Sequence, residues 1–406
     1  MSLGRSFSVL WSANAASNLA DGLAFVSIPL LATSLTDDPR WVAGLSTLYA
    51  LVRLLVALPI GVWVDRVDRR TILVVANVLR GVAVLALAIC VQAGVGGLIL
   101  LYVAYAIVGT LESAADNAAS SLVPSVVPKE RLDSANGRIS AAQLVADEFA
   151  GPPLGGFLFA LAAAAPIFAM GGLWAVAGLV ALALPVRSTT VMPASTVRPS
   201  MWSEAAAGAA WLARHRVVGG LALIGALASV GYMLPFSIFV IFVGERLGLD
   251  GVGYGVILAL SSIGGLVGSF TAALIRSAIG YRWTIVASLL TGAASLVALA
   301  ATDDAIIAAI LLAVYILHAV VWGICSTSLR QRLVPDSFRG RVNAAARVLG
   351  LLGLALGSLL GGLLAVVDIA VPVRAGGIVF VACAAIAFVL FRPGGLHDCR
   401  NGGASS

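Results

Sequence analysis

The sequence predicts an all-α membrane protein with twelve transmembrane helices in two halves. Hydrophobic residues make up 60% of the 406 positions and charged residues only 11%, a composition that excludes a soluble domain. Apolar runs, each about 20 residues or longer, recur along the whole chain and are long enough to cross a bilayer. A glycine motif that begins at Gly151 returns at Gly357, about half the chain later. A repeat of this length predicts two equivalent halves of six helices.

Twelve apolar runs are the expected spans. The first contains Asn14, Asn18 and Asp21 and lacks a small-residue cleavage site, so we expect it to stay as a helix rather than to be removed as a signal peptide. The runs occupy residues 7–35, 41–64, 71–93, 97–120, 138–162, 166–186, 217–243, 252–275, 283–301, 304–328, 342–366 and 372–391.

The distribution of basic residues predicts a cytoplasmic location for both termini. If the amino terminus is cytoplasmic, only Arg40, Arg246 and Arg374 fall on the outer side, and Arg53, Arg80 and Arg347 lie within spans. Basic residues concentrate on the cytoplasmic side of membrane proteins, so this orientation in a cell membrane is the expected one. The inner side receives Arg5, Arg66, Arg69, Arg70, Lys129, Arg131, Arg138, Arg187, Arg198, Arg214, Arg216, Arg276, Arg282, Arg330, Arg332, Arg339, Arg341, Arg392 and Arg400.

Four regions follow from this organisation. Residues 1–186 and 217–392 are the two predicted six-helix bundles, and 393–406 form a cytoplasmic tail. Residues 187–216 are a linker that ends in an alanine-rich stretch with Trp211. That stretch is consistent with an interfacial amphipathic helix or with a plain solvated connector.

A charged segment joins the second and third runs, and it carries a family resemblance. It reads Gly61-x-x-x-Asp65-Arg66-x-x-Arg69-Arg70 between two apolar runs, so the turn must be tight. This pattern resembles the loop between helices 2 and 3 of the major facilitator superfamily of secondary transporters. The resemblance implies two pseudo-symmetric six-helix bundles that work by alternating access. Asp68 is expected to cap the third helix.

Further segments resemble the drug-exporting branch that includes macrolide efflux proteins and the enterobactin exporter. The segment from Glu112 to Asn136 is similar to that branch's connection between helices 4 and 5, and Arg339-Gly340-Arg341-Val342 is similar to its entry to helix 11. Gly151-Pro152-Pro153-Leu154-Gly155-Gly156 is similar to the motif of antiporters, although the glycines that precede it there are missing here. The resemblance therefore implies proton antiport.

The helix packing implied by the resemblance puts helix 11 beside helix 2. Asp65 would then bond to Arg341 or Arg347 and hold the cytoplasmic ends together in the outward-facing state. The alternative is that the charges of the motif only mark the cytoplasmic face. Together the expected latch residues are Gly61, Asp65, Arg66, Arg69, Arg70, Arg341 and Arg347.

Ionisable residues inside the spans gather in the first half. An ion at mid-membrane depth costs about 3 kcal/mol or more unless it is paired or hydrated, so these side chains should face a cavity or one another. They are candidates for proton coupling, although the acids could simply neutralise the two arginines. The set is Asp21, Arg53, Arg80, Glu112, Asp147 and Glu148, of which Asp21 and Asp147 are the first candidates.

An aromatic stripe in the second half is a candidate for the substrate cavity. Tyr232, Phe236 and Phe239 share one helical face, and His318 lies mid-span in a later run. The alternative is ordinary core or lipid contact for the stripe and a packing role for His318.

We therefore expect a proton-coupled exporter of amphipathic or apolar small molecules. A specific exporter, for example of a siderophore, is the alternative within transport, and a polytopic membrane enzyme is the alternative outside it. The four cysteines and three histidines are scattered, so we expect no metal site, no cofactor and no catalytic residue. We expect a monomer with the bilayer, protons and a small-molecule substrate as partners, and no nucleic acid.

Overall fold

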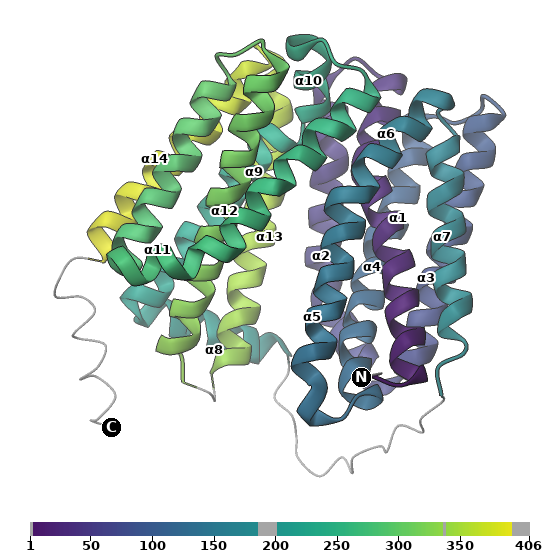
Figure 1. Ribbon diagram of the computed structural model, residues 1–406, viewed down its shortest axis with the longest axis horizontal. Helices are drawn as coiled ribbons and strands as arrows, with labels where there is room; N and C mark the ends of the chain where they lie inside the picture. Colours follow the sequence, from purple (N-terminus) through teal and green to yellow (C-terminus); the bar gives the residue numbers. More distant parts are fainter. Residues whose placement is uncertain (1–2, 186–200, 336–337, 392–406) are drawn as a thin grey trace. The chain divides into compact units, whose positions relative to one another are not determined.

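The computed structural model describes residues 3–185, 201–335 and 338–391, apart from the side chains of residues 57–66, 129 and 201–205. All regular structure in this part of the chain is helical (Figure 1). The elements are α1 (Arg5–Leu35), α2 (Pro39–Arg66), α3 (Arg69–Gln92), α4 (Leu98–Val126), η1 (Lys129–Arg131), α5 (Leu132–Gln143), η2 (Leu144–Ala150), α6 (Gly151–Leu161), α7 (Ala165–Ala181), α8 (Met201–Arg214), α9 (Arg216–Phe236), α10 (Phe239–Leu247), α11 (Gly251–Leu299), α12 (Ala305–Leu333), α13 (Arg339–Ala365) and α14 (Ala370–Leu390).

Nine helices in the described residues are long and apolar enough to cross a membrane. One of them, α11, has 49 residues and contains a break at Gly280, where φ is 77° and ψ is 168°. Such a φ suits glycine because it has no Cβ to clash with the backbone. The break falls between the two spans expected at 252–275 and 283–301. The total of twelve spans stays a prediction.

Helix ends follow local chemistry. The Asp68 carboxylate accepts a hydrogen bond from the backbone N–H of Thr71 at 3.0 Å, which confirms the predicted cap of α3. Asp304 caps α12 in the same way, accepting from the N–H groups of Ile306 and Ile307. Pro235 lies in the last turn of α9, where the helix gives way to the short α10.

The helices assemble into two compact units. In the first, α3 packs against α4 and α7, and α1 packs against α6 and α7. In the second, α9 packs against α13 and α14. Two short segments group with the opposite half of the sequence: 38–50 belongs to the second unit and 248–259 to the first. The predicted domain boundaries stay a prediction.

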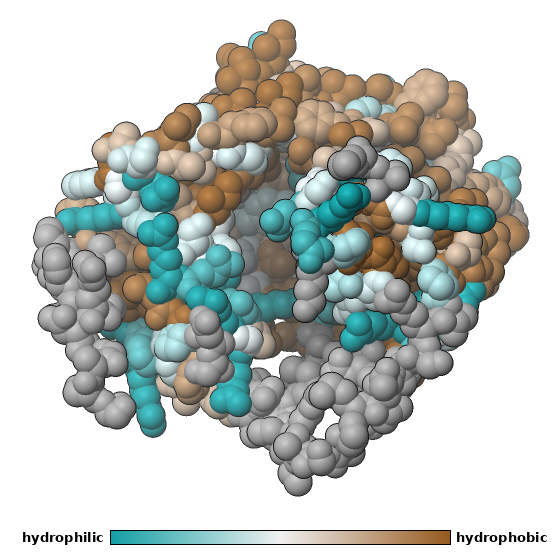
Figure 2. Space-filling view, turned by 60° about the horizontal axis from the view of Figure 1, so that its bottom comes forward, coloured by the Kyte–Doolittle hydropathy of each residue, from teal (hydrophilic) through white to brown (hydrophobic). Residues whose placement is uncertain are grey.

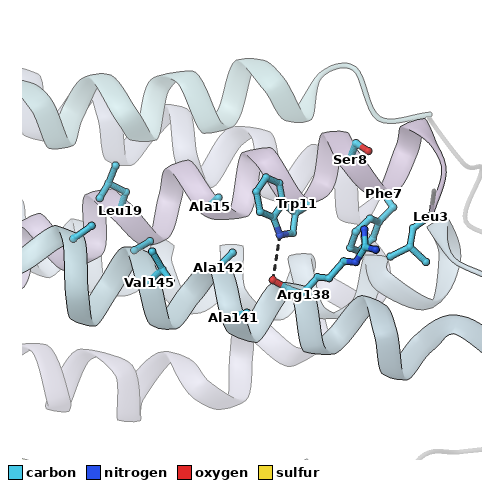
Figure 3. A pocket seen from close by; sticks show the side chains of 12 residues that line it. Leu3, Phe7, Ser8, Trp11, Ala15, Leu19, Arg138, Ala141, Ala142 and Val145 are labelled. Atoms are coloured by element: carbon cyan, nitrogen blue, oxygen red, sulfur yellow. Dashed lines mark hydrogen bonds between the residues drawn. The ribbon is translucent and has the colours of Figure 1, made fainter. Parts of the chain in front are cut away.

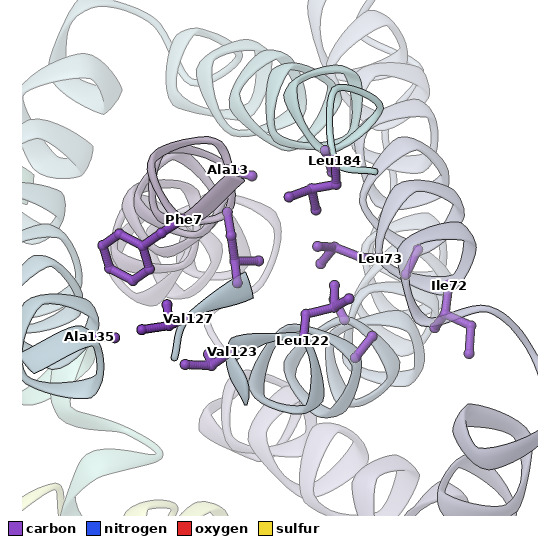
Figure 4. Packing of buried hydrophobic residues seen from close by; sticks show 14 of the residues in the cluster. Phe7, Ala13, Ile72, Leu73, Leu122, Val123, Val127, Ala135 and Leu184 are labelled. Carbon is purple, nitrogen blue, oxygen red and sulfur yellow. The ribbon is translucent and has the colours of Figure 1, made fainter. Parts of the chain in front are cut away.

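A core of the first unit is made of small and branched apolar side chains from several helices. Phe7, Leu73 and Leu122 converge there from α1, α3 and α4, and Leu184 joins them from just beyond α7 (Figure 4). Figure 2 shows hydrophilic residues gathered on the face that comes forward, whereas hydrophobic residues dominate the surfaces that recede from it. Such a distribution suits helices that cross a bilayer and end in water.

The linker helix α8 packs against α13 in the second unit. Leu212 is buried with Val342 and Val334 in a common apolar cluster, and the Trp211 ring stacks on His215 with 3.6 Å between centroids. A Cβ on Gly208 would collide with the backbone of Arg341, so the two helices approach closely. The end of the linker is therefore a docked helix rather than a plain connector.

Two basic residues predicted to lie outside pair with acids. Arg40 bonds to Asp38 at 2.6 Å, and Arg246 forms an ion pair with Asp303. The hydrogen bonds from Arg40 hold the pKa of Asp38 below its usual value.

Candidate functional site

The centre of the candidate site is Arg80 on α3, whose side chain has no solvent exposure. Its Nη2 forms an ion pair with Oδ1 of Asp21 on α1 and lies 3.6 Å from Oε2 of Glu112 on α4. A buried guanidinium must be neutralised and hydrogen-bonded because the low-dielectric interior cannot solvate it. Two acids from two different helices share this task.

The network continues from Glu112 to α2. Arg53 Nη1 lies 3.2 Å from Glu112 Oε1, and Arg53 Nη2 lies 3.9 Å from Oδ2 of Asp116. One line of ion pairs therefore joins α1, α3, α4 and α2. Its side-chain exposure rises from 0% at Arg80 through 13% at Glu112 and 25% at Arg53 to 56% at Asp116.

The cluster contains three carboxylates and two guanidinium groups. When all five side chains of Asp21, Arg53, Arg80, Glu112 and Asp116 are ionised, its formal charge is about −1. Asp116 is more than half exposed, whereas Asp21, Glu112 and the two arginines are mostly shielded from solvent. In the shielded part of the cluster, each charge must be balanced by a neighbouring charge or hydrogen bond.

Neutral side chains fix the position of Arg80. Its Nη1 donates to Ser17 Oγ at 3.2 Å and to Asn77 Oδ1 at 3.5 Å. Its guanidinium lies 4.2 Å from the ring centroid of Trp174 on α7, a cation–π contact in which Trp174 is 1% exposed. Beside Ser17 and Asn77 lies a polar cavity of about 10 Å³, which Asp116 also lines. That volume is about the minimum for one water molecule.

Asp147 lies in an unusual backbone segment next to the cluster. It belongs to η2, a π-helix of seven residues between α5 and α6. A Cβ on Gly22, the neighbour of Asp21, would lie 2.8 Å from Asp147 Cα, so the two backbones touch. Asp147 Oδ1 is buried and has no hydrogen-bond partner among the described residues, whereas Glu148 is exposed. Local π-helices often occur at functional sites.

The glycine motif of α6 forms two seams within the first unit. A Cβ on Gly151 would lie 2.5 Å from Gly22 Cα, and one on Gly155 would lie 3.0 Å from the Leu23 oxygen, both on α1. Gly156 instead contacts Gly251 at the start of α11, and Pro152 contacts Gly255 one turn later. Small residues let helix backbones approach in this way.

The repeated motif makes equivalent contacts in the second unit. Gly357 and Gly361 pack against the backbone of α9, and Gly362 packs against Pro39 and Ala43 at the start of α2. The repeat that the sequence shows therefore has the same packing role in both units.

The expected latch is only partly described. The structure does not describe the side chains of residues 57–66, which include the latch positions Gly61, Asp65 and Arg66. Arg69 donates to the Ser121 oxygen near the end of α4 at 3.0 Å, and Arg70 donates to the Leu182 oxygen after α7. Cations there stabilise the negative ends of the two helix dipoles.

Two basic latch candidates belong to α13. Arg341 lies over the Phe338 ring at 5.7 Å, and Arg347 is exposed. The latch itself stays a prediction.

The aromatic candidates lie in a packed cluster of the second unit. Tyr232 and Phe236 stack at 4.4 Å, Phe236 stacks on Phe239 at 5.4 Å, and Tyr315 lies among them. His318 is 1% exposed, and its Nδ1 contacts the Tyr315 backbone oxygen. Phe239 and His318 are buried, whereas Tyr232 and Phe236 are half-buried. The substrate role of this cluster stays a prediction.

The structure brings Asp21, Arg53, Arg80 and Glu112 of the predicted set into one network, and their role in coupling stays a prediction. Sequence reasoning missed several of their neighbours. Asp116 lies four residues after Glu112 and so on the same helical face, a signal that could have added it to the candidates. Ser17, Asn77 and Trp174 gave no comparable signal because isolated polar or aromatic residues are common in membrane helices.

Known proteins share this architecture. Among solved structures, a bacterial homologue of the iron transporter ferroportin in an inward-facing state superposes with a TM-score of 0.77 at 18% identity, covering 96% of this chain and 99% of that one. The nucleoside transporter NupG gives 0.76 at 11% identity, covering 95% and 99%. These likenesses concern the fold.

Sequence comparison points the same way. The enterobactin exporter EntS of Escherichia coli O1:K1 / APEC is 23% identical over 347 residues, which are 84% of this chain and 81% of that protein. The protein of the same name from Shigella boydii serotype 4 (strain Sb227) is also 23% identical over the same shares. The sequence model of the major facilitator superfamily matches residues 10–220 and 221–398 of this chain. The chain therefore belongs to the major facilitator superfamily, and it is a multi-pass membrane transporter rather than an enzyme.

Proposed function

We propose that this transporter exports amphipathic or apolar small molecules in exchange for protons. The observation that carries the proposal is the cluster of three carboxylates and two guanidinium groups, which has one negative charge in excess. Proton-coupled transport requires a group whose surroundings change during the cycle and which can take up and release a proton. The cluster joins four helices and has one carboxylate more than it has guanidinium groups, and both features support such a role.

The geometry supports a relay through Arg80. A proton on Asp21 would release the Arg80 guanidinium, which could then pair fully with Glu112. Glu112 would in turn share less of its charge with Arg53, which is also within reach of Asp116. One proton thus changes which of α1, α2, α3 and α4 are held together. Substrate binding would favour the opposite, deprotonated arrangement.

The available driving force is sufficient for uphill export. Entry of one proton down a membrane potential of about 100 mV supplies about 2.3 kcal/mol. A pH difference of one unit adds about 1.4 kcal/mol.

The test uses inverted membrane vesicles and a panel of fluorescent dyes. With an acidic lumen, vesicles that contain the transporter should accumulate at least one dye, and an uncoupler should release it. Accumulation that is unaffected by the uncoupler would contradict proton coupling, and no transport of any dye would contradict the proposed substrate class.

The alternative of a specific siderophore exporter rests on the enterobactin exporters at 23% identity. The same vesicles decide between the two functions if enterobactin is added as a competitor. Competition at low concentration together with weak dye transport would favour the specific exporter.

A further inference from the structure

An apolar groove of about 750 Å³ lies between α1 and the segment formed by α5 and η2, all within the first unit. Figure 3 shows Phe7 and Trp11 of α1 pointing toward the facing helix, which carries Arg138, Ala141 and Ala142. The lining runs from Leu3, just before α1, to Leu19, about 24 Å at 1.5 Å per residue. Small-molecule sites in proteins commonly have volumes of about 300–1,000 Å³.

The hollow exists because one of its walls is made of alanine. Ala141, Ala142, Ala146 and Ala150 share one face of the α5 and η2 segment. Because methyl groups leave the space between the two helices open, Trp11 of α1 remains 38% exposed and Val145 of η2 remains 58% exposed. Phe7, near the end of α1, is buried.

The groove has one cationic end. Among the twelve described residues that line it, Arg138 carries the only charge. The Trp11 indole N–H donates to the backbone oxygen of Arg138 at 3.1 Å, which ties the two helices together at this level. Figure 3 shows the Arg138 side chain extending toward Phe7, so its guanidinium lies beside the apolar surface.

The other end of the groove lies next to the candidate coupling site. Ala146 lines the groove, and its backbone oxygen is the closest atom to a Cβ built on Gly22, at 2.7 Å. Gly22 follows Asp21, and Ala146 precedes Asp147. This end of the groove is therefore made of residues that neighbour Asp147 in sequence and pack against the backbone next to Asp21.

We propose that this groove binds the transported substrate and that the substrate is an amphipathic anion. The apolar body of the ligand lies along the alanine wall, and its acidic group pairs with Arg138 at the cytoplasmic end. This inference rests on the proposed export function and narrows its substrate class. A guanidinium favours acidic groups because its hydrogen bonds to them are charge-assisted.

The test measures binding by the full-length chain in nanodiscs of phosphatidylcholine. The probe is 11-(dansylamino)undecanoic acid, and its methyl ester is the neutral match. Empty nanodiscs give the background partitioning into lipid. The acid should bind saturably, and the ester should bind roughly tenfold more weakly.

Two substitutions with matched controls locate the site. Arg138→Gln should weaken binding of the acid roughly to the level of the ester and leave the ester unchanged. Arg5→Gln, near the same end of α1 but outside the lining, should change neither. Ala141→Phe fills the groove and should weaken both probes, whereas Ala160→Phe at an exposed alanine of α6 should not.

Several results would overturn the proposal. Equal affinity for the acid and the ester, or an Arg138→Gln variant that binds the acid normally, would show that the groove does not select anions. Displacement of the probe by phosphatidylglycerol in the nanodiscs would show that a membrane lipid occupies it instead. Normal dye transport with no binding of the probe contradicts this inference alone, and probe binding without gradient-driven transport contradicts the export function alone.

Discussion

The Arg80 guanidinium is stabilised by groups of three kinds: the carboxylates of Asp21 and Glu112, the polar side chains of Ser17 and Asn77, and the ring of Trp174. These contacts surround a side chain that has no solvent exposure, whereas its partner Asp21 is 22% exposed. In the proposed relay, a proton on Asp21 would shift the guanidinium toward Glu112, which lies 3.6 Å away.

Trp174 should contribute to stability through its ring rather than through its size alone. We expect Trp174→Leu to lower the thermal stability of the purified protein, because it removes a desolvated cation–π contact that is worth about 2 kcal/mol. Trp174→Phe keeps an aromatic ring and should recover part of the loss. The measurement is the unfolding temperature of each variant in the same detergent. Equal losses for Leu and Phe would mean that the ring does not stabilise the cation.

Neutralising the coupling carboxylate should separate two activities. Asp21→Asn or Asp147→Asn should abolish dye transport driven by a pH gradient, while downhill exchange of the dye stays measurable. The reason is that the variant transporter still binds the dye, but its permanently neutral side chain can no longer couple movement of the dye to movement of a proton. Reconstituted vesicles measure both activities. If both variants keep gradient-driven transport, the coupling group is elsewhere, with Glu148 and Glu112 next.

Among the residues, the sequence indicated that buried ions would gather but not how they would pair. The cost of an isolated ion in a bilayer led us to expect that Asp21, Arg53, Arg80, Glu112, Asp147 and Glu148 face a cavity or one another. Four of them form the network, and these partners are about 60 positions apart in sequence, so helix geometry alone cannot pair them. The π-helix around Asp147, which packs against Gly22, had no recognisable signature in the residues.

Among the elements, α6 packs against α1 with little room for a larger side chain. Gly151→Ala adds a Cβ that would lie 2.5 Å from Gly22 Cα. Because this distance is too short for two carbon atoms, the two helices must separate. We expect lower stability, by about 1–3 kcal/mol, and reduced transport.

Gly172→Ala on α7 is the matched control because nothing lies within 4 Å of its Cβ. It should be neutral or slightly stabilising, since alanine favours a helix by about 1 kcal/mol over glycine. Expression-normalised transport and unfolding temperature measure both variants. A Gly151→Ala protein as stable as Gly172→Ala would contradict the close approach of α1 and α6.

Helix positions were largely predictable because apolar length is a strong signal in membrane proteins. The break at Gly280 falls between two spans that the sequence indicated, and α8 occupies the alanine-rich end of the predicted linker. The groove was not foreseen, because alanines such as Ala141 and Ala142 look like ordinary membrane residues until the facing helix is known. Its existence depends on what lies opposite them.

For the whole molecule, the orientation in the membrane is the first property to test. In a background without the four native cysteines, Asp68→Cys should resist an impermeant maleimide added to intact cells. Asp38→Cys and Asp303→Cys should react, because basic residues gather on the side of Asp68 and membrane proteins keep that side cytoplasmic. Reaction at Asp68→Cys with protection of the other two positions would reverse the assignment.

In the proposed mechanism, one proton and the substrate compete through the cluster around Arg80. The most direct measurement is proton release when a transported dye is added to purified protein in weakly buffered detergent, followed with a pH indicator. Binding of the dye should release about one proton per transporter, because the two ligands favour opposite states and their coupling is reciprocal. The Asp21→Asn variant should bind the dye and release none. Wild-type protein that binds the dye without releasing protons would contradict the account.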